Sequence, residues 1–236
     1  MNRTHPFRLA ALALSFAFTL PAAAPAAFAD GGGSAPSMPS SSAPASTTQP
    51  MSPEEQAAIA RKKAEDTYAS AYKDVEKAQK ELEEAATLRA AGDEKSTKKA
   101  AEKEASATKK LKKSESRFAE VVAVTPENAN AWNMLGYSRR MTGNLDGAFT
   151  AYWKCLEIDP QHAGAHEYLG EAYLKSGKLA QARGELAFLE KKGAPEAAKL
   201  KTSIAAWEKA NPEAVQAAAA GAGAKPSVTP PEIEKK

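Results

Sequence analysis

A repeat of 34 residues is the feature of this sequence that most constrains its fold. When the chain is aligned with itself at that spacing, seven residues between 129 and 148 recur unchanged between 163 and 182. The identical pairs are Ala129 and Ala163, Ala131 and Ala165, Leu135 and Leu169, Gly136 and Gly170, Gly143 and Gly177, Leu145 and Leu179, and Ala148 and Ala182. A fixed period of this length indicates stacked structural units that bury a continuous core between neighbours.

Each unit has the pattern of two amphipathic helices separated by a glycine near its middle, Gly143 in the first unit and Gly177 in the second. Small residues lie where the two helices of a unit are expected to cross closely, as at Gly136 and Ala148. We therefore predict an all-α fold.

The repeated units resemble the tetratricopeptide repeat (TPR) family. The residues that match its packing pattern are Trp132, Leu135, Gly136, Ala148, Tyr152 and Pro160 in the first unit and Leu169, Gly170, Tyr173 and Ala182 in the second. The second unit departs from the pattern at His166, which replaces the tryptophan, at Leu186, which replaces an aromatic residue, and at Pro195, which comes one residue late. The resemblance implies a short helical solenoid, covering 126–210 with two units and a capping helix.

Residues 52–125 predict a long antiparallel helical hairpin ahead of the repeats. Ser52, Pro53 and Glu55 form a helix start signal, and no glycine or proline follows before Gly92. We expect its helices to pack through apolar seams, namely Tyr68, Tyr72, Val75, Leu82 and Ala86 in the first and Ala107, Leu111, Ser114, Phe118 and Val121 in the second. The last part of the hairpin resembles a degenerate TPR half-unit, because it keeps the 34-residue register with the repeats.

Residues 1–29 have the order of features of a secretory signal peptide. Arg3 and Arg8 precede an apolar stretch from Leu9 to Leu20, and Ala27-Phe28-Ala29 is a small-x-small cleavage motif. The apolar stretch of about 12 residues is shorter than the roughly 20 that a membrane-spanning helix needs. We expect a periplasmic or secreted protein with no transmembrane span, a disordered linker over 30–51 and a disordered tail over 211–236.

Composition gives little reason to expect a polyanionic partner. Loss of Arg3 and Arg8 with the signal peptide leaves 30 basic against 29 acidic residues. The segment 94–113 is locally basic, with eight lysines and three glutamates, so a weak contact with an acidic surface is one interpretation and a solvated helix face the other. We expect no nucleic-acid partner, because aromatic residues do not alternate with these lysines.

Candidate chemical groups have ordinary structural interpretations. His162 and His166 are four residues apart, but one follows Pro160 in a turn and the other occupies the family's tryptophan position, so we predict no metal site. Cys155 falls where the family has a small apolar residue, which favours a buried thiol over a redox role. The sequence contains no phosphate loop, GxSxG or HExxH motif. We predict no enzymatic activity and no cofactor.

The resemblance implies that the first helix of each unit lines a concave face on which partners bind. The residues that it places there are Asn130, Asn133, Tyr137, Arg140, Met141, Glu167, Glu171, Leu174 and Lys175. Among them, Tyr137 and Arg140 are expected to contribute to partner binding and not to the fold, the alternative being that Tyr137 packs against the neighbouring hairpin. The sequence thus predicts a periplasmic scaffold for a protein or peptide of the cell envelope. The alternative is a structural spacer whose long hairpin self-associates as a coiled coil, and the oligomeric state stays open.

Signal peptidase should cleave the exported protein after Ala29, because the small-x-small motif follows the apolar core directly. Amino-terminal sequencing or intact-mass measurement of the exported protein should find Asp30 as the first residue. A product that retains Met1 would contradict the prediction.

Overall fold

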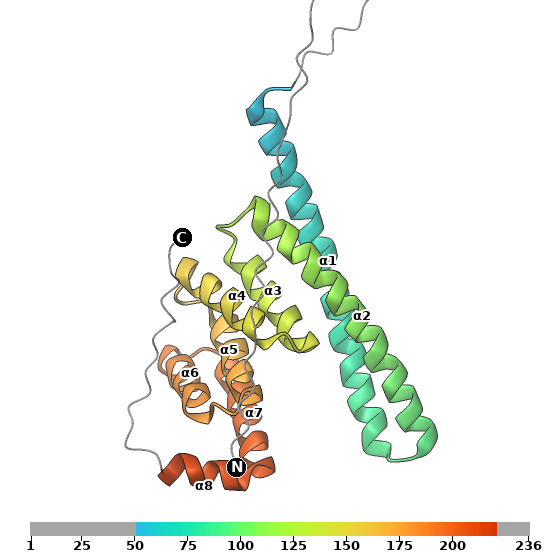
Figure 1. The fold of residues 1–236 in the computed structure, drawn as a ribbon, viewed down its shortest axis with the longest axis vertical. Helices are drawn as coiled ribbons and strands as arrows, with labels where there is room; N and C mark the ends of the chain where they lie inside the picture. The colour runs from blue at the N-terminus through green and yellow to red at the C-terminus, as the bar shows by residue number, and fades with distance from the viewer. Residues whose placement is uncertain (1–50, 221–236) are drawn as a thin grey trace, which may run out of the picture. The chain divides into compact units, whose positions relative to one another are not determined.

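The computed structural model describes residues 51–220, except for the side chains of 217–220, and this part of the chain forms eight helices (Figure 1). They are α1 (Pro53–Ala91), α2 (Glu94–Val124), α3 (Ala129–Thr142), α4 (Leu145–Ile158), α5 (Ala163–Lys175), α6 (Leu179–Lys192), α7 (Glu196–Ala210) and α8 (Pro212–Ala220). The all-α TPR-type fold is thus confirmed. The predicted signal peptide, nearly all of the linker and residues 221–236 of the tail lie outside the described residues.

Local sequence signals determine where α1 and α2 begin and end. The Ser52 hydroxyl accepts from the Glu55 amide at 3.2 Å, and the Glu55 carboxylate accepts from the Ser52 amide at 2.8 Å, which satisfies two free helix amides. Gly92 ends α1 with φ 76°, a left-handed conformation that residues with a side chain rarely adopt. Asp93 then caps α2 by accepting from the Ser96 amide at 2.9 Å. The chain therefore reverses within two residues.

Small residues form the contact between α1 and α2. The buried positions repeat every seven residues along both helices, as Ala64, Ala71, Ala78 and Ala85 on α1 and Ala100, Ala107, Ser114 and Val121 on α2. A strict seven-residue spacing keeps one seam facing the partner helix. The expected seam on α1 is wrong in part, because Tyr72 is 41% exposed and Ala86 is also exposed. Tyr68 and Leu82 pack instead against a core that α3 shares.

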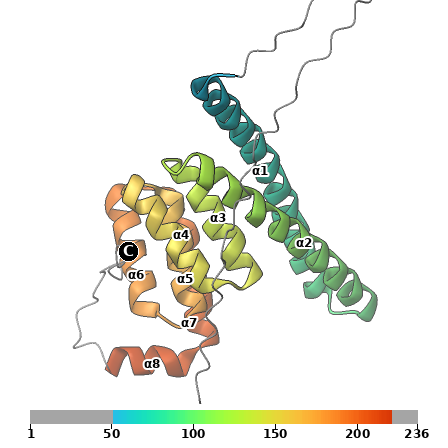
Figure 2. The same cartoon turned by 45° about the horizontal axis from the view of Figure 1, so that its top comes forward.

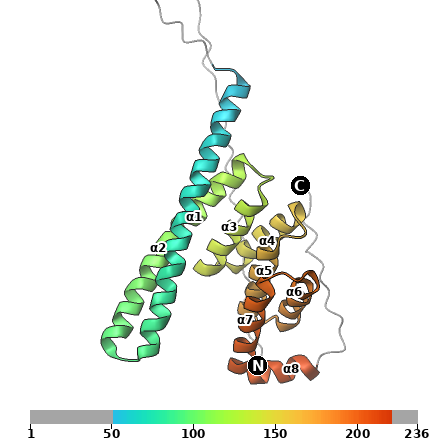
Figure 3. The same cartoon turned by 180° about the vertical axis from the view of Figure 1, so that it is seen from behind.

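The helices alternate between two layers. The odd-numbered helices α1, α3, α5 and α7 contact one another in succession, whereas α2 and α4 contact only odd-numbered helices of the described chain. The hairpin therefore continues the alternation of the repeats, with α1 in the position of a first helix and α2 in that of a second. Figures 2 and 3 show α3, α5 and α7 following one another beside the hairpin. These odd-numbered helices form the inner layer.

Two apolar clusters fill the space between the layers. One joins α1, α2 and α3 around Phe118, Leu111 and Leu135, and the other joins α4 to α7 around Tyr152, Leu189 and Leu200. Tyr168 packs against both clusters, so the hairpin and the repeats share a continuous interior.

The carboxyl-terminal part of the described chain differs from expectation. Residues 212–220 form α8, so the segment that we expected to begin a disordered tail is helical. Val215 of α8 packs against the second apolar cluster, which gives this alanine-rich helix a tertiary contact. No described helix has an apolar stretch that could cross a bilayer.

At Gly136, α3 lies close against Tyr152 of α4. A Cβ atom at this position would lie 2.5 Å from Cε1 and 2.6 Å from Cδ1 of Tyr152, whose ring is fully buried. Gly136→Leu should therefore lower the free energy of unfolding by roughly 1–3 kcal/mol, as overpacking of a rigid core does.

Gly184 on α6 is the matched control, since a Cβ there would meet nothing within 4 Å. Thermal melts followed by circular dichroism should show a lower midpoint for Gly136→Leu and an equal or higher one for Gly184→Leu, because leucine favours helix more than glycine does. Equal midpoints for wild type and Gly136→Leu would contradict the packing.

Candidate functional site

A groove lies between α1 and the inner helices α3, α5 and α7. It consists of two adjoining hollows of about 510 and 390 Å³, which share Glu167, Tyr168 and Lys199. The first is also lined by Gln79, Leu82, Glu83, Tyr137, Arg140, Met141, Glu171 and Lys175. The second is also lined by Tyr68, Tyr72, Asn130, Asn133, Met134, Gly164 and Glu196. We refer to the two hollows together as the groove and to the second as the polar hollow.

Arg140 joins the helices that form the floor of the groove. It is 4% exposed, and its guanidinium pairs with the Glu171 carboxylate at 2.6 Å and donates to the Tyr152 hydroxyl at 3.3 Å. Its Cζ lies 5.4 Å from the ring centroids of both Tyr137 and Tyr168, within reach of a cation–π interaction. Burial raises the pKa of Tyr152, so its hydroxyl stays protonated. Arg140 thus links α3, α4 and α5.

The prediction that Tyr137 and Arg140 contribute little to the fold is therefore wrong. Tyr137 is 5% exposed and packs in the cluster that α1, α2 and α3 share. Removal of Arg140 would leave Glu171 without its cation in a half-buried place, which is costly. Both residues line the groove, but their side chains also hold the fold together there.

The other residues assigned to the concave face differ in how they are placed. Asn133 and Glu167 are buried, Met141 and Glu171 are half-buried, and Asn130 and Lys175 are exposed; all six line the groove. Leu174 does not line it. It packs in the core of α4 to α7 and is 5% exposed, so its assignment to the concave face is wrong.

The sequence did not predict that α1 forms one wall of the groove. One side of α1 carries Tyr68, Tyr72 and Leu82. Their spacing along the helix indicated an apolar stripe. We assigned that stripe to the contact with α2, which the alanines make instead. Glu196 and Lys199 were missed because the helix that carries them was interpreted only as a cap.

Three residues that line the polar hollow carry oxygen atoms without a donor among the described residues, but two of these atoms, Asn133 Oδ1 and Glu196 Oε2, are enclosed and out of a ligand's reach. Asn133 Oδ1 and Glu196 Oε2 are buried without a partner, and Glu167, which is 4% exposed, forms no hydrogen bond or ion pair with the described chain. Burial raises the pKa of Glu167 to about 7, helped by the negative charges of Glu171 and Glu196 and opposed by Lys199 and Arg140. These three acceptors come from three successive inner helices.

The remaining candidate groups have structural roles outside the groove. His162 caps α5 by accepting from the Ala165 amide at 3.1 Å, while His166 stacks on Phe188 with ring centroids 3.8 Å apart and contacts Glu185 at 2.6 Å. The two imidazoles thus face different partners. Burial, followed by the charge of Asp159, raises the pKa of Cys155 to about 12, so its thiol is unreactive.

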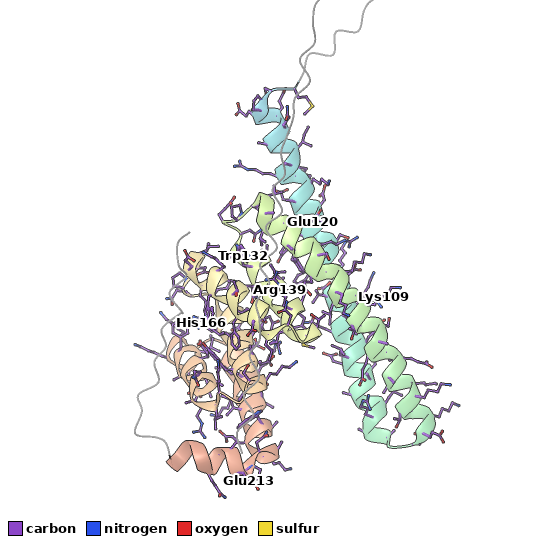
Figure 4. All side chains as sticks on the ribbon, viewed as in Figure 1. Lys109, Glu120, Trp132, Arg139, His166 and Glu213 are labelled. Atoms are coloured by element: carbon purple, nitrogen blue, oxygen red, sulfur yellow. The ribbon has the colours of Figure 1, made fainter. Side chains whose placement is uncertain are left out.

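The lysine-rich segment belongs partly to the hairpin. Lys103, Lys110 and Lys113 form ion pairs with Glu84, Glu81 and Asp74 of α1. Lys109 points outward from α2 (Figure 4). Part of the positive charge of this segment is therefore neutralised within the chain, and its outer face is solvated.

Comparison with known proteins agrees with the repeat geometry. The sequence model described as "Tetratricopeptide repeat" matches residues 139–204. These residues span the end of α3 to most of α7, including the groove residues Arg140, Glu167 and Lys199. The chain carries tetratricopeptide repeats. TPR units typically form protein-interaction scaffolds and not enzymes.

A solved structure titled "Crystal structure of MamA protein" is similar to the chain at 17% sequence identity. The similarity covers 58% of this chain and 95% of that chain, with a TM-score of 0.31. No curated protein sequence matches the chain. The TPR assignment therefore rests on the family match and on the internal repeat.

Glu167 should make the stability of the TPR array depend on pH. Its folded pKa of about 7 lies above the usual glutamate value of 4.5, so its contribution to stability is present below about pH 4.5 and is lost as the pH rises through 7. Glu167→Gln mimics the protonated carboxyl. It should leave the melting midpoint unchanged at pH 5 and raise it at pH 8.

Glu190→Gln is the matched control, because it removes one carboxylate from an exposed site on α6. The difference in melting midpoint between Glu190→Gln and wild type should be small and the same at pH 5 and pH 8. An equal effect of Glu167→Gln at the two pH values would contradict the raised pKa.

Proposed function

We propose that this chain is an exported, periplasmic TPR scaffold that binds a segment of a protein or peptide partner in the groove between α1 and the inner helices. The observation that carries the proposal is the polar hollow, which is lined by Glu167, a carboxylate that is 4% exposed and has no hydrogen bond or ion pair within the described chain. A buried polar group without a partner, such as the Glu167 carboxylate, costs about 1–3 kcal/mol of free energy. A partner that supplies donors there recovers that cost on binding.

The dimensions and lining of the groove suit a peptide segment. Its two hollows fall within the usual size of binding pockets, roughly 300–1,000 Å³, and a continuous surface around Tyr168 connects them. Tyrosines and Leu82 supply apolar contact, while asparagine, lysine and glutamate side chains supply groups that can pair with a peptide backbone. The groove therefore offers both parts of a typical recognition surface.

Three further features support a non-catalytic role in the envelope. No serine, cysteine or histidine is among the described residues that line the groove, so it lacks the usual nucleophile and base pairs. The amino-terminal sequence has the features of a signal peptide. The one cysteine is buried, so the fold does not depend on a disulfide in an oxidising compartment.

Self-association through the hairpin has less support. The seven-residue seams of α1 and α2 are buried against each other, and their flanks are joined by ion pairs such as Arg89 with Glu104 at 2.6 Å. Large exposed apolar residues of the hairpin, including Ile59 and Val124, do not continue these seams. The hairpin therefore lacks a second seven-residue seam like the one that joins α1 to α2.

A bulky residue at Gly164 should block the groove without unfolding the repeats. A Cβ there would contact Asn133 Nδ2 at 3.4 Å and the His162 ring at 3.5 Å, which the backbone tolerates, and a tryptophan ring would extend into the polar hollow. Gly184→Trp is the matched control, because that position is open and lies on α6 outside the groove.

Partner binding can be detected by replacing Tyr72, which is 41% exposed in the groove, with a photo-crosslinking residue. The experiment uses full-length protein expressed in cells. We expect a discrete adduct that Gly164→Trp abolishes and Gly184→Trp preserves. The same crosslinker at Ile158 on α4 should give no such adduct. An adduct that survives Gly164→Trp would contradict binding in the groove.

A further inference from the structure

We infer that the polar hollow recognises a basic side chain of the partner, a lysine ammonium or an arginine guanidinium, through Glu167 and Glu196. This inference rests on the proposed function, because it names the chemistry of the partner that occupies the same groove.

The three acceptors are built into the fold and are not a surface cluster. Asn133 and Glu167 are more than nine-tenths buried, and the Oε2 atom of Glu196 is buried although its residue is half-buried. They belong to α3, α5 and α7, whose packing determines their separation. A ligand that pairs with the carboxylates of Glu167 and Glu196 must bring several donors into a small volume, which an ammonium with three N–H groups or a guanidinium with five can do.

The balance of charge in the polar hollow also favours a cation. Glu171 is already neutralised by Arg140, so Glu167 and Glu196 face one exposed cation, Lys199. The pKa of Glu167 shows that its carboxylate is poorly stabilised by these surroundings. A bound cation would stabilise the ionised form and lower that pKa.

The α1 wall adds aromatic contact. Tyr68 and Tyr72 stack with ring centroids 6.1 Å apart and line the same hollow, so they can cover the methylene stem or the cationic head group of an incoming side chain. Tyr72 is 41% exposed despite its size. A basic side chain crossing these rings explains why a large aromatic residue stays uncovered at this place.

An acidic partner group is the opposing alternative, since the amino-terminal ends of α3, α5 and α7 lie near this hollow and helix dipoles attract anions. Glu167 and Glu196 already occupy these positions with negative charge. An additional carboxylate would meet both of them.

The experiment begins with a library of random 12-residue peptides displayed on phage and selected on the full-length exported protein. Peptides whose binding is lost with Gly164→Trp and kept with Gly184→Trp define groove ligands. We expect them to share a lysine or arginine at one position. Replacement of that residue by norleucine should weaken binding roughly 10- to 100-fold, the range for losing hydrogen bonds to a charged group.

Protein variants then locate the contact by calorimetry with a selected peptide. Glu167→Gln with Glu196→Gln should weaken the basic peptide roughly 10- to 100-fold and should leave the norleucine peptide unchanged. Glu190→Gln should have no effect, and Lys199→Gln should strengthen binding up to about five-fold by removing the opposing cation. The carboxyl carbon resonance of Glu167 should titrate at lower pH when the basic peptide is bound.

The outcomes separate the two proposals. If no selected peptide depends on Gly164, both the groove function and this inference fail. If groove ligands exist but lack a basic residue, carry an acidic one at the shared position, or ignore Glu167→Gln with Glu196→Gln, the groove function stands and the cation site is overturned.

Discussion

The buried guanidinium of Arg140 is the interaction on which the inner face of this protein depends. It connects α3 to α4 through Tyr152 and to α5 through Glu171, and it lies against the rings of Tyr137 and Tyr168. A buried charge is stable only when paired and hydrogen-bonded, so the surrounding helices must keep the geometry that supplies those partners. Because Tyr137 also packs with residues of α1, the same cluster joins the hairpin to the repeats.

The groove follows from this arrangement. Once Arg140 and its partners fix α3 and α5, α7 packs against α5 through the close approach of Leu200 to Gly170, where an added Cβ would lie 2.6 Å from Leu200 Cδ2. Glu196 and Lys199 near the beginning of α7 thereby come beside Glu167 and Asn133. The capping helix is therefore more than a cover for the last repeat. It contributes charged groups to the surface on which we propose that a partner binds.

Helix α1 has two different apolar sides, one for α2 and one for the groove. Alanines at every seventh position let α2 approach closely, and the larger Tyr68, Tyr72 and Leu82 remain available for the side that faces the inner helices. Ion pairs between α1 and α2, such as Lys110 with Glu81 at 2.8 Å, flank the alanine seam and use part of the lysine-rich segment. A helix that looks unusually long for a repeat of 34 residues thus carries one wall of the groove.

The sequence by itself determined the helical content, the register of the repeats and their TPR packing, because these depend on residues that recur at fixed spacing and on local signals such as Ser52 and Gly92. Its placement of Cys155 in the interior also agrees with the structure, since that position faces neighbouring helices in any TPR unit. The tertiary structure alone decided which side of α1 meets α2, that Tyr137 and Arg140 support the fold, and that Glu167 loses its solvent. Periodicity shows that a helix has an apolar or polar face but not which neighbour covers it. The burial of Glu167 and the missing donors around it arise from α3, α5 and α7, which are distant in sequence and meet only after the chain has folded.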